Sequence, residues 1–378
     1  MLLPLLLACA SIRPQFDAAR AAALADPPPL RAAWEPDIEL QLSSALVDEL
    51  LDEAIAAQPA LTTELTLGPA WAKPRLTVDE VVLRPSLGVD GLLLDVALDG
   101  HVRWGLGPAD GRIPAEASAT VVVGVDAVRE GDHWLTTVKV NEVRSLDVDV
   151  AGESVGLGAL DRRVRSWLDA ALLEAPALPL TVVGGDGLPL RALRAEGAAK
   201  GLRLLAKSQT PVAVAVERPR GMPPEGFRLA VAEEALLALA RAESFRHGAV
   251  GFDVVADPQQ LSFTDGGFAL GLRLWRPVGR GWWRDYDIDG TTKVLAKRVK
   301  LQATDVREGA KSKGAALADP LAALGEGVIL RTLEDALDAA VPSTSEQALG
   351  GVEWVATVTD IAPGTQRTVV VSGTAAAR

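Results

Sequence analysis

Apolar and polar residues alternate along several stretches of the chain, as expected for antiparallel strands with one buried face. Between residues 92 and 104 the alternate side chains are mostly apolar, and those between them include Asp95, Asp99, His101 and Arg103. A second stretch repeats the alternation through Phe268, Leu270, Leu272 and Leu274. The pattern predicts long antiparallel strands, with His101 on a solvated face.

Two of the predicted strands contain an insertion between apolar runs. Asp79-Glu80 interrupts one strand, and Asn141-Glu142 interrupts another. An inserted residue that keeps both apolar runs on one face is typical of a β-bulge, which bends the strand. We therefore expect curled sheets rather than flat ones.

The order strand, then helix, occurs twice. A strand at 38–42 runs into a helix that ends near Ala57, and Ser43-Ser44 can cap its first turn. A strand at 227–231 likewise runs into a helix through Leu236. Each of these helices is followed by a long region of strand pattern.

The second half of each unit also matches. Residues 165–170 and 331–336 are similar in sequence, and a proline follows each arginine by eleven residues, at Pro176 and Pro342. Self-similarity at roughly 180 residues indicates duplication of a whole domain. We expect an elongated α+β fold of two tandem modules, in which curled antiparallel sheet wraps around amphipathic helices. Their predicted bounds are 37–216 and 227–378, with a Pro/Gly-rich linker at 217–226.

The N-terminal residues form a short leucine-rich run that ends at the single cysteine, Cys9. Leu6-Leu7-Ala8-Cys9 resembles the lipobox of bacterial lipoproteins. The resemblance implies a signal peptide at 1–8, acylation of Cys9 and a lipidated tether at 9–36. Ala10 after the cysteine implies, by the same resemblance, an anchor in the outer membrane of a bacterial envelope, facing the periplasm. A buried free Cys9 is the alternative.

The composition of the chain argues against several classes of function. The formal charge of −12, from 38 basic and 50 acidic residues, argues against a nucleic-acid partner. One cysteine excludes an internal disulfide and a cysteine-based zinc cluster. With only three histidines, the chain has few side chains suited to acid–base or metal chemistry. We therefore expect no cofactor, no bound metal and no enzymatic activity.

The duplicated order of helix, long antiparallel strands, second helix and closing strands resembles the tubular lipid-binding (TULIP) superfamily. Its best-known branch has the bactericidal permeability-increasing protein fold. The resemblance covers about 36–216 and 224–378, and it implies that each module holds acyl chains in an apolar groove. Candidate lining residues are the apolar positions Leu46, Leu50, Leu94, Val96, Trp167, Leu172, Leu236, Leu270, Leu272, Leu333 and Leu337. Ordinary core packing is the alternative for each.

Two motifs have a catalytic or metal-binding form. Residues 152–156 match G-x-S-x-G around Ser154, but the preceding strand alternates and no HGG-type oxyanion motif occurs. Residues 285–290 match the start of an EF-hand loop, whose twelfth position requires glutamate and is Ala296 here. A glycine-rich connection and an acidic strand face are the favoured interpretations.

A predicted hairpin at 275–284 concentrates tryptophan and arginine. Both residue types suit the headgroup region of a membrane, so Trp275, Trp282, Trp283 and Arg284 are candidates for membrane contact. In the alternative, a ring packs inward and the arginines pair with Asp285 and Asp287.

The leading hypothesis is a non-catalytic envelope lipoprotein that binds lipid or another elongated hydrophobic ligand. A tail of ~16 carbons offers ~12 kcal/mol before ordering costs. The alternatives are a scaffold lipoprotein with an unknown protein partner and a serine hydrolase using Ser154.

Overall fold

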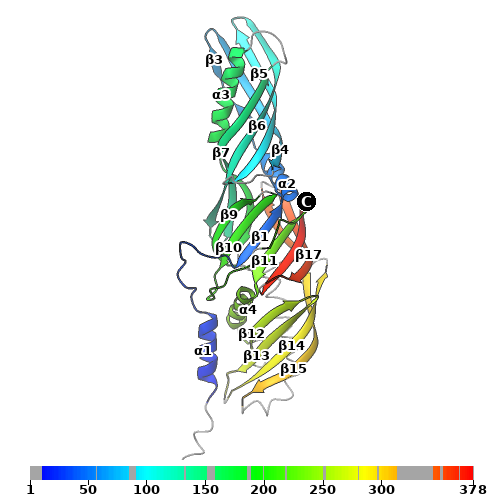
Figure 1. Cartoon of the computed structure of the whole chain (residues 1–378). Helices are drawn as coiled ribbons and strands as arrows, with labels where there is room; N and C mark the ends of the chain where they lie inside the picture. Colours follow the sequence, from blue (N-terminus) through cyan, green and yellow to red (C-terminus); the bar gives the residue numbers. More distant parts are fainter. Residues whose placement is uncertain are drawn as a thin grey trace, which may run out of the picture.

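The structure is a computed structural model. It describes residues 11–56, 58–84, 91–131, 133–150, 158–184, 189–198, 200–217, 219–249, 253–279, 281–295, 298–312, 344–349, 352–365 and 367–377. The molecule is elongated, and three antiparallel sheets follow one another along its length (Figure 1). The described part is mostly sheet with four helices, which confirms the α+β class.

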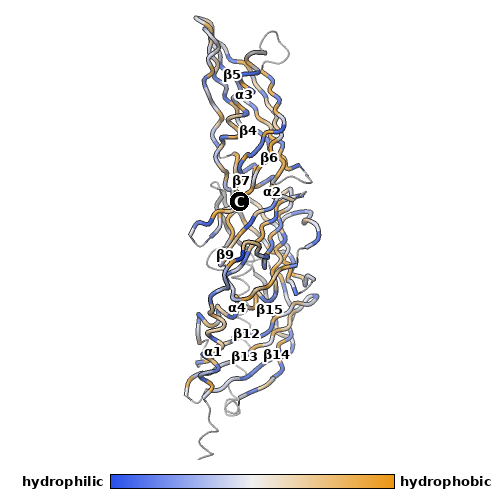
Figure 2. Tube along the Cα trace, turned by 60° about the vertical axis from the view of Figure 1, so that its left-hand side comes forward, coloured by the Kyte–Doolittle hydropathy of each residue, from blue (hydrophilic) through white to orange (hydrophobic). Residues whose placement is uncertain are grey.

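The first sheet lies at one end of the molecule and has the strand order β2-β4-β5-β6-β7-β8, with β3 paired to β4. Its long strands alternate between buried and exposed residues, and Figure 2 shows orange and blue segments following one another along them. The strands are β2 (Leu61–Thr62), β3 (Leu65–Leu67), β4 (Ala70–Arg84), β5 (Leu92–Leu106), β6 (Ala109–Glu130), β7 (His133–Val150) and β8 (Leu178–Gly184).

Both predicted irregularities are present in this sheet. The register between β4 and β5 shifts between Val78 and Glu80. The register between β6 and β7 shifts twice, so that Asn141 and Arg144 have no partner opposite them. An unpaired residue bends its strand, so these shifts are sites at which β4 and β7 can curve.

Helices α2 (Ser44–Ala56) and α3 (Gly158–Glu174) pack against this sheet. The predicted cap of α2 is confirmed, because the Leu46 backbone N–H donates to Ser43 Oγ at 3.3 Å. Helix α3 ends before Pro176, as predicted, and the chain returns to the sheet as β8.

The central sheet combines the two halves of the chain in the order β16-β17-β18-β11-β1-β10-β9. The strands predicted to be equivalent, β1 and β11, lie side by side, and Leu40 is paired with Leu229. The bounds are β1 (Ile38–Ser43), β9 (Leu190–Ala198), β10 (Gly201–Ser208), β11 (Phe227–Ala232), β16 (Thr344–Leu349), β17 (Val352–Pro363) and β18 (Thr368–Ala377).

The third sheet is a four-stranded meander beside helix α4 (Glu233–His247). Its inward residues include Leu270 and Leu272, which are buried as the alternation predicts. The strands are β12 (Val255–Thr264), β13 (Gly267–Arg276), β14 (Trp282–Leu295) and β15 (Arg298–Lys311).

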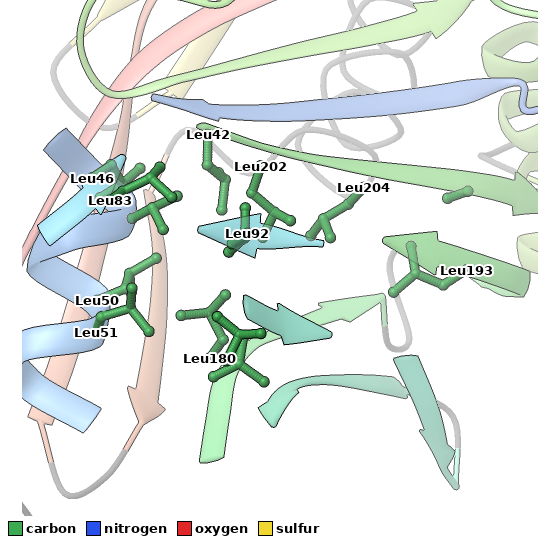
Figure 3. Close-up of a cluster of buried hydrophobic side chains, with 14 of the residues drawn as sticks. Leu42, Leu46, Leu50, Leu51, Leu83, Leu92, Leu180, Leu193, Leu202 and Leu204 are labelled. Carbon is green, nitrogen blue, oxygen red and sulfur yellow. The ribbon is translucent and has the colours of Figure 1, made fainter. Parts of the chain in front are cut away.

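The core at the junction between the first and central sheets is built from leucines. Leu50 and Leu51 of α2 lie opposite Leu180 of β8, and Leu92 and Leu202 lie beside them (Figure 3). Leu51, Leu92, Leu180 and Leu202 are each at most 1% exposed. The junction is therefore a continuous apolar core.

Both faces of the central strand β1 are buried. Asp37, Glu39 and Gln41 alternate with its apolar residues and have no exposed surface. Asp37 accepts hydrogen bonds from Ser208 N and Oγ, and Gln41 Nε2 donates to Pro219 O in the connection between the halves. That connection covers the polar face of the strand.

The segment expected to be only a tether contains helix α1 (Arg13–Ala23). Its buried side chains are Phe16 and Ala23, and Ile12 before the helix is also buried. They pack against Phe245 of α4 and Trp275 of β13. Within the predicted tether, these residues therefore form a helix that packs against the second half of the chain. Among the described helices, none is long and apolar enough to cross a membrane.

Candidate ligand-binding site

A cavity of about 290 Å³ lies in the first half, between the inner face of the first sheet and the C-terminal ends of α2 and α3. Its walls are almost entirely aliphatic. The wall residues include Leu51, Ile55, Val81, Leu94, Val96, Val121, Val123, Val138, Val140, Leu172 and Leu178.

The strand bulges determine which side chains reach the cavity. Val78 and Val81 both line it, although three positions separate them and simple alternation would place them on opposite faces. The shifted register after Val78 restores Val81 to the inner face. Val123 and Val140 are paired across β6 and β7 beside the second irregularity, and both line the cavity.

The helices close the cavity with their last turns. Leu51 and Ile55 of α2 are one turn apart and share a face. Leu172 near the end of α3, followed by Ala175 and Pro176, forms the opposite wall. Because Pro176 cannot continue the helix, the chain leaves α3 at the cavity and enters β8.

The polar residues that border this cavity are Gln58, Thr77 and Lys139, and all three are exposed. Thr77 and Lys139 alternate with inward residues of β4 and β7, so their side chains lie on the outer face of the sheet. Thr77 Oγ1 already donates to Asp99 O at 3.1 Å. The interior therefore offers an apolar surface that can hold a hydrocarbon group, and its lining carries no acid–base pair.

Solved structures similar to this chain share about a tenth of its residues. They include "Crystal structure of lipopolysaccharide binding protein", with 10% identity, a TM-score of 0.37 and coverage of 91% of this chain and 99% of that one. P47 of Clostridium botulinum E1 has 9% identity and a TM-score of 0.42, over 90% and 99% of the two chains. P47 from Clostridium botulinum A2 has 9% identity and a TM-score of 0.41, over 90% and 97%.

No protein-family model matches the chain, and no curated protein is similar to it in sequence. Each of these TM-scores is below 0.5.

Three predicted lining residues, Leu94, Val96 and Leu172, line the cavity. Leu46 and Leu50 lie in the adjoining core and do not reach it. Other predicted lining residues lie elsewhere in the core, with Trp167 partly buried in the first half and Leu236, Leu270 and Leu272 buried in the second. Outside the described residues lie Leu333, Leu337, Cys9 and Ser154.

Several lining residues were not predicted, although the sequence carries their signal. Leu51 and Ile55 continue the helical spacing of α2, and Val121 and Val123 alternate along β6. Helix α1 also has a signal, because Ile12, Phe16 and Ala19 follow helical spacing and a proline occupies its first turn.

The tryptophans of the hairpin between β13 and β14 are not at a membrane-facing tip. Trp275 is 2% and Trp282 is 7% exposed, and Trp275 Nε1 donates to Asp257 at 3.0 Å. Arg284 is buried beside Glu308, at 3.6 Å. The prediction of membrane contact is therefore wrong for Trp275, Trp282 and Arg284, because all three side chains are buried.

Trp283 is partly buried, and its ring stacks with Arg273 at 4.3 Å from the guanidinium carbon to the centroid. Arg273 also donates to both Asp285 oxygens, at 2.6 and 2.8 Å, which raises the pKa of the guanidinium. Asp285 belongs to strand β14 and not to a calcium loop. Within the described ranges, no group of three His, Cys, Asp or Glu side chains could hold a metal ion.

Proposed function

We propose that this chain binds, without catalysis, a lipid or another elongated hydrophobic ligand whose apolar part occupies the cavity of the first half. The observation that carries this proposal is the aliphatic lining, whose three polar residues are all exposed. Ligand sites are typically apolar hollows with a few polar groups that fix orientation.

The volume of the cavity is sufficient for part of an acyl chain but not for a whole lipid. Its 290 Å³ is about twice the ~150 Å³ cavity that binds benzene, and near the lower end of the ~300–1,000 Å³ range of ligand sites. Burial of six methylenes would contribute about 5 kcal/mol before ordering costs. The remainder of an elongated ligand would leave past Gln58, which is exposed beside the edge strand β2.

Native mass spectrometry of the full chain purified from a bacterial host tests this function. We expect bound lipid that organic solvent extracts. Consistent absence of lipid, together with no retention of a fluorescent fatty acid, would contradict the proposal. That outcome would favour the alternative, a scaffold lipoprotein whose fold is filled by its own side chains.

We also propose that the chain is a lipoprotein of a bacterial envelope, anchored through Cys9 and facing the periplasm from the outer membrane. The support is the Leu6–Cys9 lipobox pattern and the spacer after helix α1, which includes Pro27-Pro28-Pro29. Metabolic labelling with an alkyne fatty acid should mark the wild-type chain and not Cys9→Ser. Equal labelling of both would contradict the anchor.

The two halves are proposed to be duplicated modules, at 37–216 and 227–378. The support is the repeated order of strand and helix, β1-α2 and β11-α4, each followed by long antiparallel strands. The duplication predicts a helix through 331–341 that corresponds to α3. An experimental structure with that segment in another form would contradict it.

A further inference from the structure

A row of cations crosses the outer face of the first sheet. Lys73 of β4 is paired directly with Arg103 of β5, and Arg103 is paired directly with Arg112 of β6. All three are exposed, while their neighbours Ala72, Pro74 and Val102 are buried. Like charges placed directly opposite one another destabilise a sheet, so the fold alone gives no reason for this row.

A second row lies two residues along the same strands. Arg75 of β4 is paired with His101 of β5. His101 Nδ1 lies 3.0 Å from Arg112 Nη2, and because a guanidinium can only donate, Nδ1 accepts this bond. The ring is then neutral with its proton on Nε2, which leaves a further donor beside the arginines.

The positive charge is only partly compensated. Lys73 pairs with Glu64 at 2.9 Å, and Asp99 lies near His101. Arg75, Arg103 and Arg112 have no ion pair among the residues that the structure describes. This local excess of cations occurs in a chain whose formal charge is −12.

These side chains line a hollow of about 780 Å³. Its margin is formed by Thr62, Thr63 and Glu64, so two hydroxyls add to the donors. The guanidinium fork matches the oxygens of a phosphate group in a bidentate manner. An anion in this hollow would relieve the repulsion between the opposed cations.

The hollow lies on the outer face of the first sheet and the apolar cavity on its inner face, and two segments border both. Leu61 lines the cavity and the next residue, Thr62, lines the hollow. On β4, Thr77 lines the cavity and Arg75 lines the hollow, a separation of about 7 Å along a strand. Thr62 is paired with Arg75, so the two contacts coincide at the edge formed by β2.

We propose that this hollow is an anion site that holds the phosphate group of an amphiphilic ligand, while its tail passes around the edge strand β2 into the cavity. Arg103 and Arg112 bind the phosphate, and Arg75, Lys73 and His101 flank it. The assignment rests on the proposed function, because it names the headgroup of the same ligand. A free phosphate would meet the same donors, so the test separates these two sources.

The test compares two ligands with the same tail, lysophosphatidic acid and monoacylglycerol, on the full chain. Wild type should bind lysophosphatidic acid at least about tenfold more tightly, as expected for charge-assisted hydrogen bonds. The double variant Arg103→Gln with Arg112→Gln should lose that preference and keep its affinity for monoacylglycerol. The matched control is Arg144→Gln, at an exposed arginine of β7 outside the hollow, which should behave as wild type.

Two results would overturn the anion site as proposed. Equal affinity of wild type for both ligands would show that the hollow does not hold the headgroup. Binding of inorganic phosphate that depends on Arg103 and Arg112, without a preference for lysophosphatidic acid, would assign the hollow to free phosphate instead. Failure of monoacylglycerol itself to bind would contradict the proposed function, and it is therefore distinguishable from both.

Discussion

The rings of Phe16 and Trp275 lie 6.0 Å apart, centroid to centroid, in an edge-to-face arrangement at 70°. This contact joins helix α1 to the second half of the chain. Phe16 also lies 5.8 Å from the ring of Phe245. Most of the residues from Leu24 to Ala33 are exposed, and Arg191 donates one hydrogen bond to Pro28 O. The buried side chains of α1 therefore supply most of its attachment.

Replacement of Phe16 by alanine should release α1 without unfolding the body. The aromatic contacts are lost at the edge of the core, and each such pair contributes about 0.5–1.5 kcal/mol beyond its buried area. Limited proteolysis should then cleave within 24–33 much faster than in wild type. Gln15→Ala, at an exposed position of the same helix, is the control. Unchanged cleavage of Phe16→Ala would show that α1 does not depend on this ring.

Trp282→Ala combined with Trp283→Ala should lower stability without changing vesicle binding. Trp282 is in the core, where truncation of a large aromatic costs about 3–5 kcal/mol, and Trp283 stacks on Arg273. Thermal unfolding and sedimentation with anionic vesicles measure the two effects. If the double variant remains folded but binds vesicles more weakly than wild type, the membrane-contact hypothesis is restored.

Variants of Asp48 in α2 should separate the stability contributed by its hydrogen bond from the effect of its negative charge. Burial raises the pKa of its carboxyl above 3.8, although the Leu83 backbone N–H, which donates at 2.6 Å, opposes the shift and nearby Asp52 adds to it. Because the folded pKa is raised, the stability this group contributes is present below pH 3.8 and is lost as pH rises through the folded pKa.

Asp48→Asn should therefore be at least as stable as wild type at pH 7, since the amide oxygen still accepts from Leu83. Asp48→Ala leaves that N–H unpaired and should lose about 1–3 kcal/mol. Chemical denaturation at pH 7 and at pH 3.5 measures both variants. A wild type that is clearly more stable than Asp48→Asn at pH 7 would contradict the raised pKa.

The anion site should bind more tightly as pH falls. Burial and the charges of Arg112 and Arg75, with Arg103 beside them, lower the pKa of His101 below 6.5, and Asp99 acts in the opposite direction. A bound anion opposes the effect of the arginines, so the complex takes up a proton more readily than the free chain. Affinity should rise as pH falls below 6.5.

Sulfate is the suitable probe, because it does not titrate in this range. His101→Gln should bind sulfate with no dependence on pH between 5 and 7.5. Calorimetry that gives the same pH dependence for both chains would show that His101 is not the group that titrates.

The sequence predicts those parts of the fold that depend on local alternation and capping. Ser43, Pro176 and the insertion at Asp79-Glu80 each act within a few residues, and each has the predicted effect. Leu94 and Val96 were predicted to line a ligand site for the same reason, since inward positions follow from the strand period.

The remaining features depend on pairing between distant segments. Lys73, Arg103 and Arg112 become neighbours only through the register of three strands. Local alternation would place Glu39 on a solvent-facing side of its strand. It is buried instead, because the connection that contains Pro219, nearly 180 residues away, covers that face. The sequence around Trp275 predicts an exposed hairpin residue, but residues of α1 and α4 bury its side chain.

The central claim is that the cavity of the first half holds the apolar part of a ligand, and a cavity-filling substitution tests it most directly. Val96 lines the cavity, while Leu98, the next inward residue of β5, is buried outside it. Phenylalanine at either position overpacks the same strand, so the pair separates occupation of the cavity from loss of stability.

The measurement is the amount of lipid that remains bound to each purified full-length chain in native mass spectrometry. The account predicts bound lipid on wild type and on Leu98→Phe, and a large loss on Val96→Phe while that chain remains folded by circular dichroism. Equal lipid on all three chains would contradict the assignment of the cavity, and lipid on none of them would contradict lipid binding itself.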